Sequence, residues 1–290
     1  MNKQIRDMLA DLAERIINNK DDWFCPFPRG KMPYNATTDH QYHGVNILSL
    51  AFQSMSMGYT SDGWATYRQW KSIGAQVRKG EKGTLIVRKG QWMRKEGDDA
   101  IPTSYFKTWN VFNAEQVDGY DVPQDPVFTY PMEERHNRAN ATISATGAIV
   151  RDGARCAYFP KSNQIHMVPR KMFTAHDAYW HTLFHELVHW SGYNMKPPRI
   201  KKEDEIWKKD KSIQYAVEEI TAEIGASILA CQHGIILDKN TSDHPYIAGW
   251  LSSIPKSDRP AALMTGAADA WKASEFINGF SQSAEDQQAA

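Results

Sequence analysis

The chain has 290 residues, 41% of them hydrophobic, and its 34 Lys and Arg residues balance 34 Asp and Glu residues. This length suits one large domain or two ordinary ones, and the zero net charge excludes a partner recognised by overall charge alone. Three widely spaced cysteines without a CxxC pair exclude a disulfide framework. With no signal peptide and no apolar stretch long enough to span a membrane, we expect a cytoplasmic protein without a membrane partner.

Helical periodicity and glycine-bounded strands alternate in the N-terminal half. Apolar residues three and four apart predict helices over 3–19 and 44–57, and a short helix over 64–74 is predicted to end at a glycine. Strands are predicted over 84–87 and 104–113, joined by turns that contain glycine. We therefore expect a mixed α/β domain in this half.

A segment rich in proline divides the sequence. Residues 118–141 hold three prolines and few periodic apolar residues, which predicts a linker. We place the domain boundary near residue 135, giving domains 1–135 and 136–290.

The C-terminal half begins with an apolar helix or strand around 139–150. A hairpin of two strands, 156–159 and 164–168, is then predicted, followed by a helix over 174–190 with a capping box of Thr174 and Asp177. Further helices are expected over 212–232, 245–253 and 260–276, before a frayed tail. The fold class is therefore α+β, with a small antiparallel sheet beside a bundle of helices.

The strongest chemical signal is HELVH at residues 185–189. Residues four apart in a helix lie on one face, so His185 and His189 can reach a single ion. Zinc held in this way lowers the pKa of a water towards ~7, and Glu186 is positioned to take its proton as the water attacks a carbonyl group. The motif predicts a metallopeptidase with Glu186 as its catalytic residue.

The helix predicted over 212–232 offers a third ligand. Glu219 and Glu223 are four apart among small and aliphatic residues, which indicates a buried carboxylate pair that needs a cation or a donor. We assign Glu219 as the third ligand, with Glu218 as the alternative, and Glu223 as the partner that fixes a ligand histidine's tautomer. This donor set is typical of catalytic Zn²⁺, and it also accepts Mn²⁺ or Co²⁺.

Other polar residues near the motif are weaker candidates. His181 is rotated away from the two ligand histidines, because four residues drift by about 40° on a helix. His166 either lines the cleft beside an edge strand that binds extended substrate or is a plain strand histidine. Oxyanion support falls to one of four residues that the sequence does not separate: Tyr193, His233, His244 and Tyr246.

Residues 64–109 are locally basic, with ten Lys and Arg residues against four Asp and Glu residues, and aromatic residues lie between the cations. Cations that follow a phosphate backbone and rings on which bases stack are typical of a protein that binds single-stranded DNA. The predicted DNA-binding residues are Trp64, Tyr67, Arg68, Trp70, Lys71, Arg78, Lys79, Lys82 and Arg88. The alternative is structural, because rings at 64, 67 and 70 also suit a core and the RKGEKG run suits a solvated turn.

Longer stretches resemble one family, ArdC antirestriction proteins. Residues 42–51, 64–87 and 108–120 resemble its N-terminal domain, with QVRKGEKG the most specific part. Residues 157–173, 179–192, 218–229 and 246–254 resemble its metallopeptidase domain, around HELVHWSG. The resemblance spans residues 40–275 in order. One departure is NMKPPRI at residues 194–200, where the family pattern has a basic segment containing leucine.

The resemblance implies a gluzincin-like domain after a domain that binds single-stranded DNA, in a plasmid-borne protein that protects entering conjugative DNA from host restriction. It carries the metal-ligand roles to His185, His189 and Glu219, and the catalytic role to Glu186. Two other functions remain open. One is a DNA-targeted metalloprotease that cleaves a DNA-bound host protein, and the other is a single-strand binder whose metal is structural.

Overall fold

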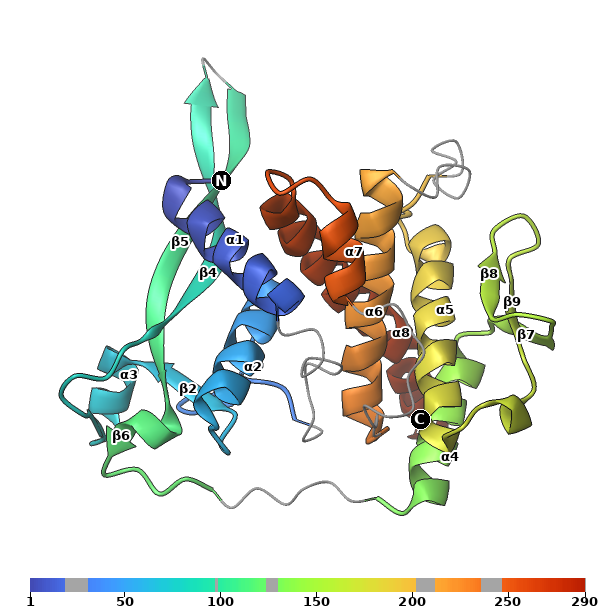
Figure 1. Cartoon of the computed structure of the whole chain (residues 1–290), viewed down its shortest axis with the longest axis horizontal. Coiled ribbons are helices and arrows are strands. Elements are labelled where there is room, and N and C mark those ends of the chain that lie inside the picture. The colour runs from blue at the N-terminus through green and yellow to red at the C-terminus, as the bar shows by residue number, and fades with distance from the viewer. Residues whose placement is uncertain (19–30, 97–98, 124–129, 202–211, 236–246, 290) are drawn as a thin grey trace. The chain divides into compact units, whose positions relative to one another are not determined.

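The computed structural model describes residues 1–18, 31–96, 99–123, 130–201, 212–235 and 247–289 (Figure 1). The chain is an α+β protein, which confirms the predicted fold class. It divides into two compact units, residues 1–12 with 32–124, and residues 13–31 with 125–290. None of the helices in the described segments has the length and apolar character that crossing a bilayer requires.

Unit 1, residues 1–12 with 32–124, is a mixed sheet with short helices. Its elements are α1 (Lys3–Asn18, which continues into the second unit), β1 (Tyr34–Asn35), α2 (Val45–Met57), β2 (Gly63–Thr66), α3 (Tyr67–Ser72), β3 (Gln76–Val77), β4 (Thr84–Glu96), β5 (Asp99–Asn113), η1 (Ala114–Gln116) and β6 (Val117–Asp118). One sheet has the order β1-β2-β5-β4, and β3 pairs with β6. The strands predicted over 84–87 and 104–113 are the inner ends of β4 and β5, which continue as a long antiparallel ribbon.

The segment predicted as one helix over 64–74 has two parts. Its first residues belong to β2, and α3 then begins at Tyr67, with Thr66 as its cap. The Thr66 hydroxyl accepts a hydrogen bond from the backbone amide of Gln69, and the side-chain oxygen of Gln69 accepts one from the backbone amide of Thr66. Trp70 is fully buried and donates from Nε1 to the Phe112 carbonyl at 3.0 Å. Trp64 is equally buried and packs with Leu50, Tyr59 and Val111.

Unit 2, residues 13–31 with 125–290, is a helical bundle beside a small sheet. Its elements are α4 (Met132–Ala145), β7 (Ile149–Asp152), β8 (Ala157–Phe159), β9 (Gln164–Met167), η2 (Arg170–Met172), α5 (His176–Asn194), α6 (Ile213–His233), α7 (Ile247–Ser253) and α8 (Arg259–Ala289). The predicted hairpin is confirmed as β8 and β9. The sheet is mixed, not purely antiparallel, because β7 adds a parallel strand on the other side of β9.

Helix α4 occupies part of the predicted linker. Residues 132–141 of the segment 118–141 are helical, because Pro131 precedes the helix, Glu133 and Glu134 fill its first turn, and Ala139 and Ile143 are buried at helical spacing. Residues 124–129 lie outside the described residues.

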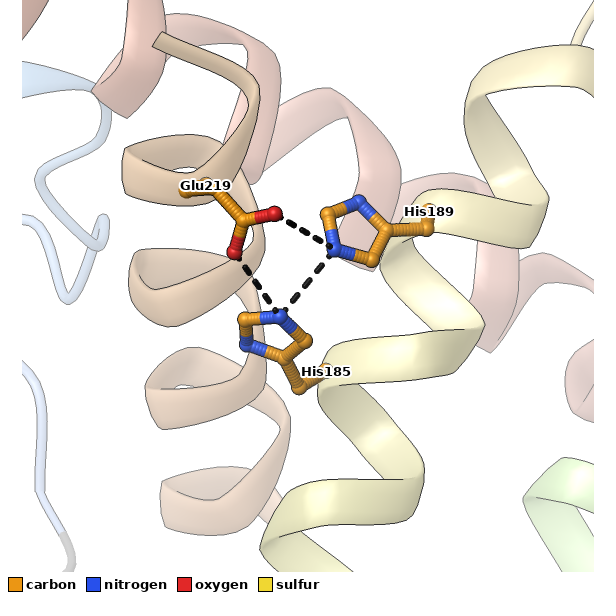
Figure 2. A group of neighbouring side chains, drawn as sticks. All are labelled: His185, His189 and Glu219. Carbon is orange, nitrogen blue, oxygen red and sulfur yellow. Dashed lines mark hydrogen bonds and ion pairs between the residues drawn. The ribbon is translucent and has the colours of Figure 1, made fainter. Parts of the chain in front are cut away.

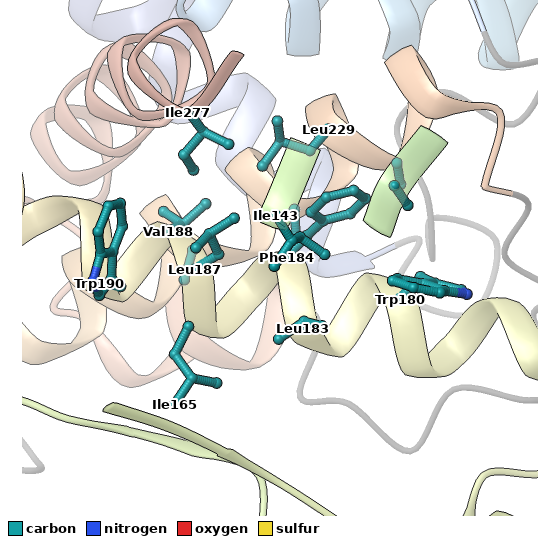
Figure 3. Packing of buried hydrophobic residues seen from close by; sticks show 14 of the residues in the cluster. Ile143, Ile165, Trp180, Leu183, Phe184, Leu187, Val188, Trp190, Leu229 and Ile277 are labelled. Atoms are coloured by element: carbon teal, nitrogen blue, oxygen red, sulfur yellow. The ribbon is translucent and has the colours of Figure 1, made fainter. Parts of the chain in front are cut away.

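Helix α5 is the centre of the core of unit 2. Leu183, Phe184, Leu187 and Val188 are buried, and they pack with residues of α4, α6, α8 and β9 (Figure 3). The predicted capping box at Thr174 and Asp177 is wrong, because α5 is capped at Ala175 without a side-chain hydrogen bond.

Asp177 instead ties the first turn of α5 to α4. It accepts from Arg135 at 2.8 Å and lies 2.6 Å from Nε2 of His136. This pair of contacts satisfies a carboxylate that the packing of the two helices buries.

The buried His233 at the end of α6 makes the stability of unit 2 depend on pH. Its ring stacks on Phe184 with centroids 5.4 Å apart. Burial, and secondarily the charge of Arg138, lowers the pKa of His233 to about 4. Below pH ~6.5 the unfolded chain therefore binds a proton that the folded chain does not, and stability falls as the pH drops from ~6.5 towards the folded pKa.

We predict that lowering the pH from 7 to 5 costs the wild type about 2 kcal/mol through this residue. In His233→Gln that loss is absent, although the variant is less stable at both values. Urea unfolding midpoints at the two pH values measure the difference. The exposed His40 supplies the control His40→Gln, which keeps the wild-type dependence. An unchanged pH dependence in His233→Gln contradicts the prediction.

Candidate metal centre

Three polar side chains from α5 and α6 converge on one point (Figure 2). Nε2 of His185 lies 3.0 Å from Nε2 of His189, and the Glu219 carboxylate lies 3.4 Å from the first and 3.8 Å from the second. Two donors that each lie ~2.1 Å from a tetrahedral ion are about 3.4 Å apart. The three measured separations scatter around this value, so the group has the dimensions of a divalent metal site.

The surroundings of the two imidazoles favour the same conclusion. Nδ1 of His189 lies 2.9 Å from Oε1 of Glu218, and Nδ1 of His185 lies 3.3 Å from Oε1 of Glu223. A carboxylate beside Nδ1 favours the proton on that nitrogen, which leaves the Nε2 lone pair free. Two lone pairs and a carboxylate then face each other within a buried space, an arrangement that a cation between them stabilises.

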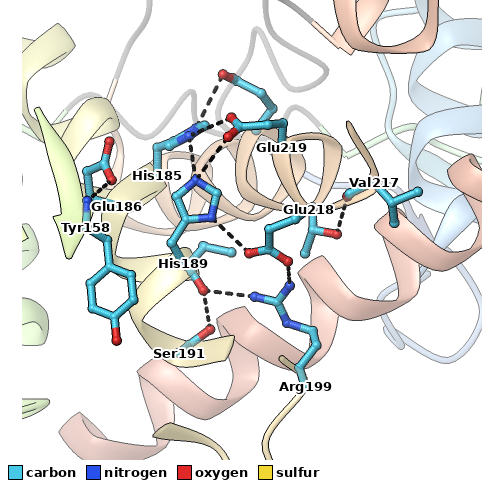
Figure 4. A network of polar contacts seen from close by, with 12 residues as sticks. Tyr158, His185, Glu186, His189, Ser191, Arg199, Val217, Glu218 and Glu219 are labelled. Carbon is cyan, nitrogen blue, oxygen red and sulfur yellow. Dashed lines mark hydrogen bonds and ion pairs between the residues drawn. The ribbon is translucent and has the colours of Figure 1, made fainter. Parts of the chain in front are cut away.

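A buried polar network contacts His189 on the side of its ring that faces away from Glu219 and His185 (Figure 4). Arg199 forms an ion pair with Oε2 of Glu218, and its Nη2 donates to the Val188 carbonyl at 2.9 Å. Arg199 belongs to the segment 194–200 that departs from the family pattern. Sequence reasoning missed this contact, because an irregular segment has no periodicity that would show which helix its side chains reach.

The electrostatics of the group follow from the same contacts. Burial alone lowers the pKa of His185, but the carboxylates of Glu223 and Glu219 outweigh burial, and this pKa lies well above its ordinary value. Burial raises the pKa of Glu219, whereas His185, His189 and the hydroxyl of Tyr215 lower it, with a net result of about 2. The surrounding carboxylates therefore favour a positive charge next to the ionised Glu219, which is the charge that a bound cation would supply.

Glu186 points to the edge strand of the sheet and is not part of the triad. Its Oε2 accepts a hydrogen bond from the Tyr158 amide of β8 at 2.6 Å. A cavity of about 530 Å³ lies here, lined by the triad, Glu186, residues 155–160, Tyr215 and Trp250. A carboxylate, a strand edge and three metal donors thus share one cavity.

The remaining candidates of this half lie elsewhere. His181 is buried on α5, four residues before His185, and is not one of the triad's donors. His166 lies against the Phe159 ring, with centroids 4.4 Å apart, and His233 stacks on Phe184 in the core. Tyr193 packs against Tyr158, and His244 and Tyr246 lie outside the described residues. Tyr215 lines the cavity, and its hydroxyl is hydrogen-bonded to Glu219. The sequence did not single out this tyrosine as a candidate for oxyanion support.

In unit 1, two of the predicted DNA-binding residues are wrong. Trp64 and Trp70 are fully buried, so neither offers a face on which a base can stack. Trp64 on β2 and Trp70 on α3 pack into two hydrophobic clusters of the unit, which is the structural alternative that the sequence left open.

The other predicted DNA-binding residues are exposed or partly exposed. Tyr67, Arg68 and Arg88 line a groove of about 970 Å³, together with Lys89 and Trp109. Lys71, Lys79 and Lys82 are exposed and do not line it. The guanidinium of Arg78 is engaged within the unit, with Glu81 at 3.0 Å, Asp118 at 3.6 Å and the Glu115 carbonyl.

Two family models match the chain. One is described as the N-terminal domain of anti-restriction factor ArdC and matches residues 2–125, and the other is described as a zincin-like metallopeptidase and matches residues 137–269. Fold and site thus define a two-part protein with a zincin-like metallopeptidase domain.

Crystal structures of the antirestriction ArdC protein from plasmid R388 superpose on this chain at 30% identity, the metal-free form with a TM-score of 0.73 and the Mn(II)-bound form with 0.71. The metal-free match covers 96% of this chain and 98% of that one. The chain belongs to the ArdC antirestriction family.

Curated relatives are similar over most of this chain. An uncharacterised protein of Sinorhizobium fredii, y4eC, is 31% identical over 85% of this chain and 80% of its own length. Two proteins named DNA primase TraC from Escherichia coli are 31% and 30% identical over 93% and 97% of this chain. The chain spans only 27% and 20% of the length of these primases.

We predict that Arg199→Met weakens metal binding about 10–100-fold, because Glu218 loses its cation and no longer holds Nδ1 of His189. Competition with a chromogenic chelator measures the affinity for Zn²⁺ and Mn²⁺. Lys272→Met, on an exposed face of α8, is the matched control and leaves the affinity unchanged. Wild-type affinity in a folded Arg199→Met protein contradicts the prediction.

Proposed function

We propose that this chain is a plasmid-type antirestriction protein that acts in the cytoplasm, binds single-stranded DNA through unit 1 and carries a zinc metallopeptidase site in unit 2. The observation that carries the proposal is the groove in unit 1, where exposed cations and aromatic rings meet. In unit 2, the candidate ligands His185, His189 and Glu219 share a cavity with Glu186, which supports the metallopeptidase part of the proposal.

The groove has the chemistry that single strands require. Arg68, Arg88 and Lys89 provide cations for phosphates, and the exposed Tyr67 and Trp109 provide faces for unpaired bases. Two side-chain amides of the groove, Asn35 and Gln69, already bond to each other at 3.3 Å. Stacking on the rings and charge on the phosphates do not depend on base identity, which supports binding that tolerates many sequences.

The metal centre has the parts of a hydrolase. His185, His189 and Glu219 would hold the ion, which supplies Lewis acidity for attack on a peptide carbonyl. Glu186 would accept the proton of the attacking water and pass it to the leaving amine, and the hydrogen bond from the Tyr158 amide orients its carboxylate. Tyr215 places a hydroxyl in the same cavity, where it would donate a hydrogen bond to the oxygen that gains charge. The substrate would be a host protein.

The two other functions have distinct signatures. A DNA-targeted metalloprotease requires cleavage of a protein bound to DNA, and the cavity beside β8 supports it. A single-strand binder with a structural metal requires only that the ion stabilise unit 2, and the burial of His189 and Glu219 supports that.

We predict that Glu186→Gln lowers hydrolysis of a quenched fluorescent peptide library by about 10²–10⁴-fold, because the proton acceptor is lost while the metal donors remain. Elemental analysis and gel shifts should show unchanged metal content and DNA binding. Glu133→Gln, on α4, is the matched control. A Glu186→Gln protein that still fully protects a conjugating plasmid makes hydrolysis dispensable, and this outcome favours the structural metal.

We predict that the chain binds an unstructured oligonucleotide more tightly than its duplex, with affinity that falls steeply as salt rises. Arg68→Ala removes one phosphate contact and reduces the slope of log affinity against log salt by about 0.7. Lys3→Ala, an exposed change on α1, leaves the slope unchanged. Equal affinity for duplex and single strand would refute single-strand binding.

A further inference from the structure

The ribbon of β4 and β5 projects beyond the rest of its sheet. Strand β2 pairs with β5 only from Val111 to Asn113, whereas β4 and β5 stay paired as far as Glu96 and Asp99 (Figure 1). Most of the ribbon is therefore two strands wide. It contains large exposed rings, Trp92 at 52%, Tyr105 at 37% and Trp109 at 37% exposure.

The pairing register places these rings on one face. Successive residues of a strand point to opposite faces, and directly paired residues share a face. The pairs Ile86–Trp109, Arg88–Lys107, Gly90–Tyr105 and Trp92–Thr103 therefore form four successive rungs on the same face. Rungs on one face are about 6.8 Å apart. Their order is aromatic, cationic, aromatic, aromatic.

Gly90 allows Tyr105 to lie across the ribbon. A Cβ at position 90 would be 2.4 Å from Cζ of Tyr105, so the phenol ring lies over the glycine and not out to the side. Lys107 Nζ is 5.4 Å from the centroid of the same ring. The ring is thus held in a flat orientation next to a cation, while more than a third of its surface stays exposed.

The cationic rung has a charge arrangement that an anion would stabilise. Arg88 and Lys107 are directly opposite each other, and like charges in this position destabilise a sheet. Among the described residues no carboxylate forms an ion pair with either of them, and both are exposed. A phosphate between them would relieve the repulsion. Trp109, on the next rung, also lines the groove of unit 1, so the two surfaces are continuous.

We propose that this face of the ribbon is a stacking ladder that extends the path of single-stranded DNA out of the groove, with a phosphate at the Arg88–Lys107 rung and bases on Trp109, Tyr105 and Trp92. The ladder rests on the proposed function and extends its DNA-binding surface beyond the groove, to Lys107, Tyr105 and Trp92. Duplex DNA does not fit it, because paired bases present no free faces.

The test uses the full chain and compares two labelled 20-mers, oligothymidine and an abasic strand that has the same phosphates but no bases. Fluorescence anisotropy at low salt gives the affinities. Trp92→Ala and Tyr105→Ala each lower the affinity for oligothymidine about tenfold and leave the affinity for the abasic strand unchanged. Trp92→Phe and Tyr105→Phe keep the affinity, because phenylalanine retains a stacking face.

The matched control is Met93→Ala. Met93 is 57% exposed, adjoins Trp92 and points to the opposite face, so its removal leaves both affinities unchanged. Equal losses on both strands in the alanine variants would overturn the ladder, because they indicate a general loss of charge or fold. Wild-type oligothymidine affinity in these variants, while Arg68→Ala still weakens binding, overturns the ladder and leaves the proposed function intact. If the wild type binds no single strand, the proposed function fails, and the ladder fails with it.

Discussion

The convergence of two imidazoles and a carboxylate depends on how closely α5 and α6 approach each other. Gly225 of α6 faces Val188 of α5, and a Cβ at position 225 would lie 2.7 Å from Cγ2 of Val188. Val188 is fully buried and β-branched, so it has little freedom to move aside. The absence of a side chain at 225 thus sets the helix separation, and the separation brings Glu219 within 3.8 Å of both histidines.

This separation also concentrates charge. Glu218, Glu219 and Glu223 are all buried on α6, and each lies against a cation or an imidazole from elsewhere. Arg199 compensates one of these charges, and a divalent ion would compensate most of the rest. Binding of the ion and stability of unit 2 are therefore linked, whichever of the proposed functions holds.

Sequence patterns predicted contacts within helices better than contacts between segments. HELVH and the Glu219–Glu223 spacing are local, and a period of 3.6 shows which residues share a face. The contact of Arg199 with Glu218 comes from an irregular segment and has no such signal. In unit 1, local composition could not separate buried from exposed tryptophans. Arg88, Gly90 and Trp92 alternate along one strand, and Tyr105, Lys107 and Trp109 alternate along its neighbour. Both patterns were present in the sequence, but placing them on one face required the strand register.

The two-stranded width of the β4–β5 ribbon has a consequence for how copies of the protein meet. Strand β2 pairs with β5 only at the inner end, so over most of the ribbon the outer edges of β4 and β5 have no neighbouring strand within the described residues. Such edges tend to pair with those of another molecule. Arg88, Lys89 and Lys107 oppose that joining by mutual repulsion. A nucleic acid lying along the ribbon would neutralise these charges. Copies bound to the same DNA molecule would then join at their ribbon edges, whereas unbound copies would remain apart.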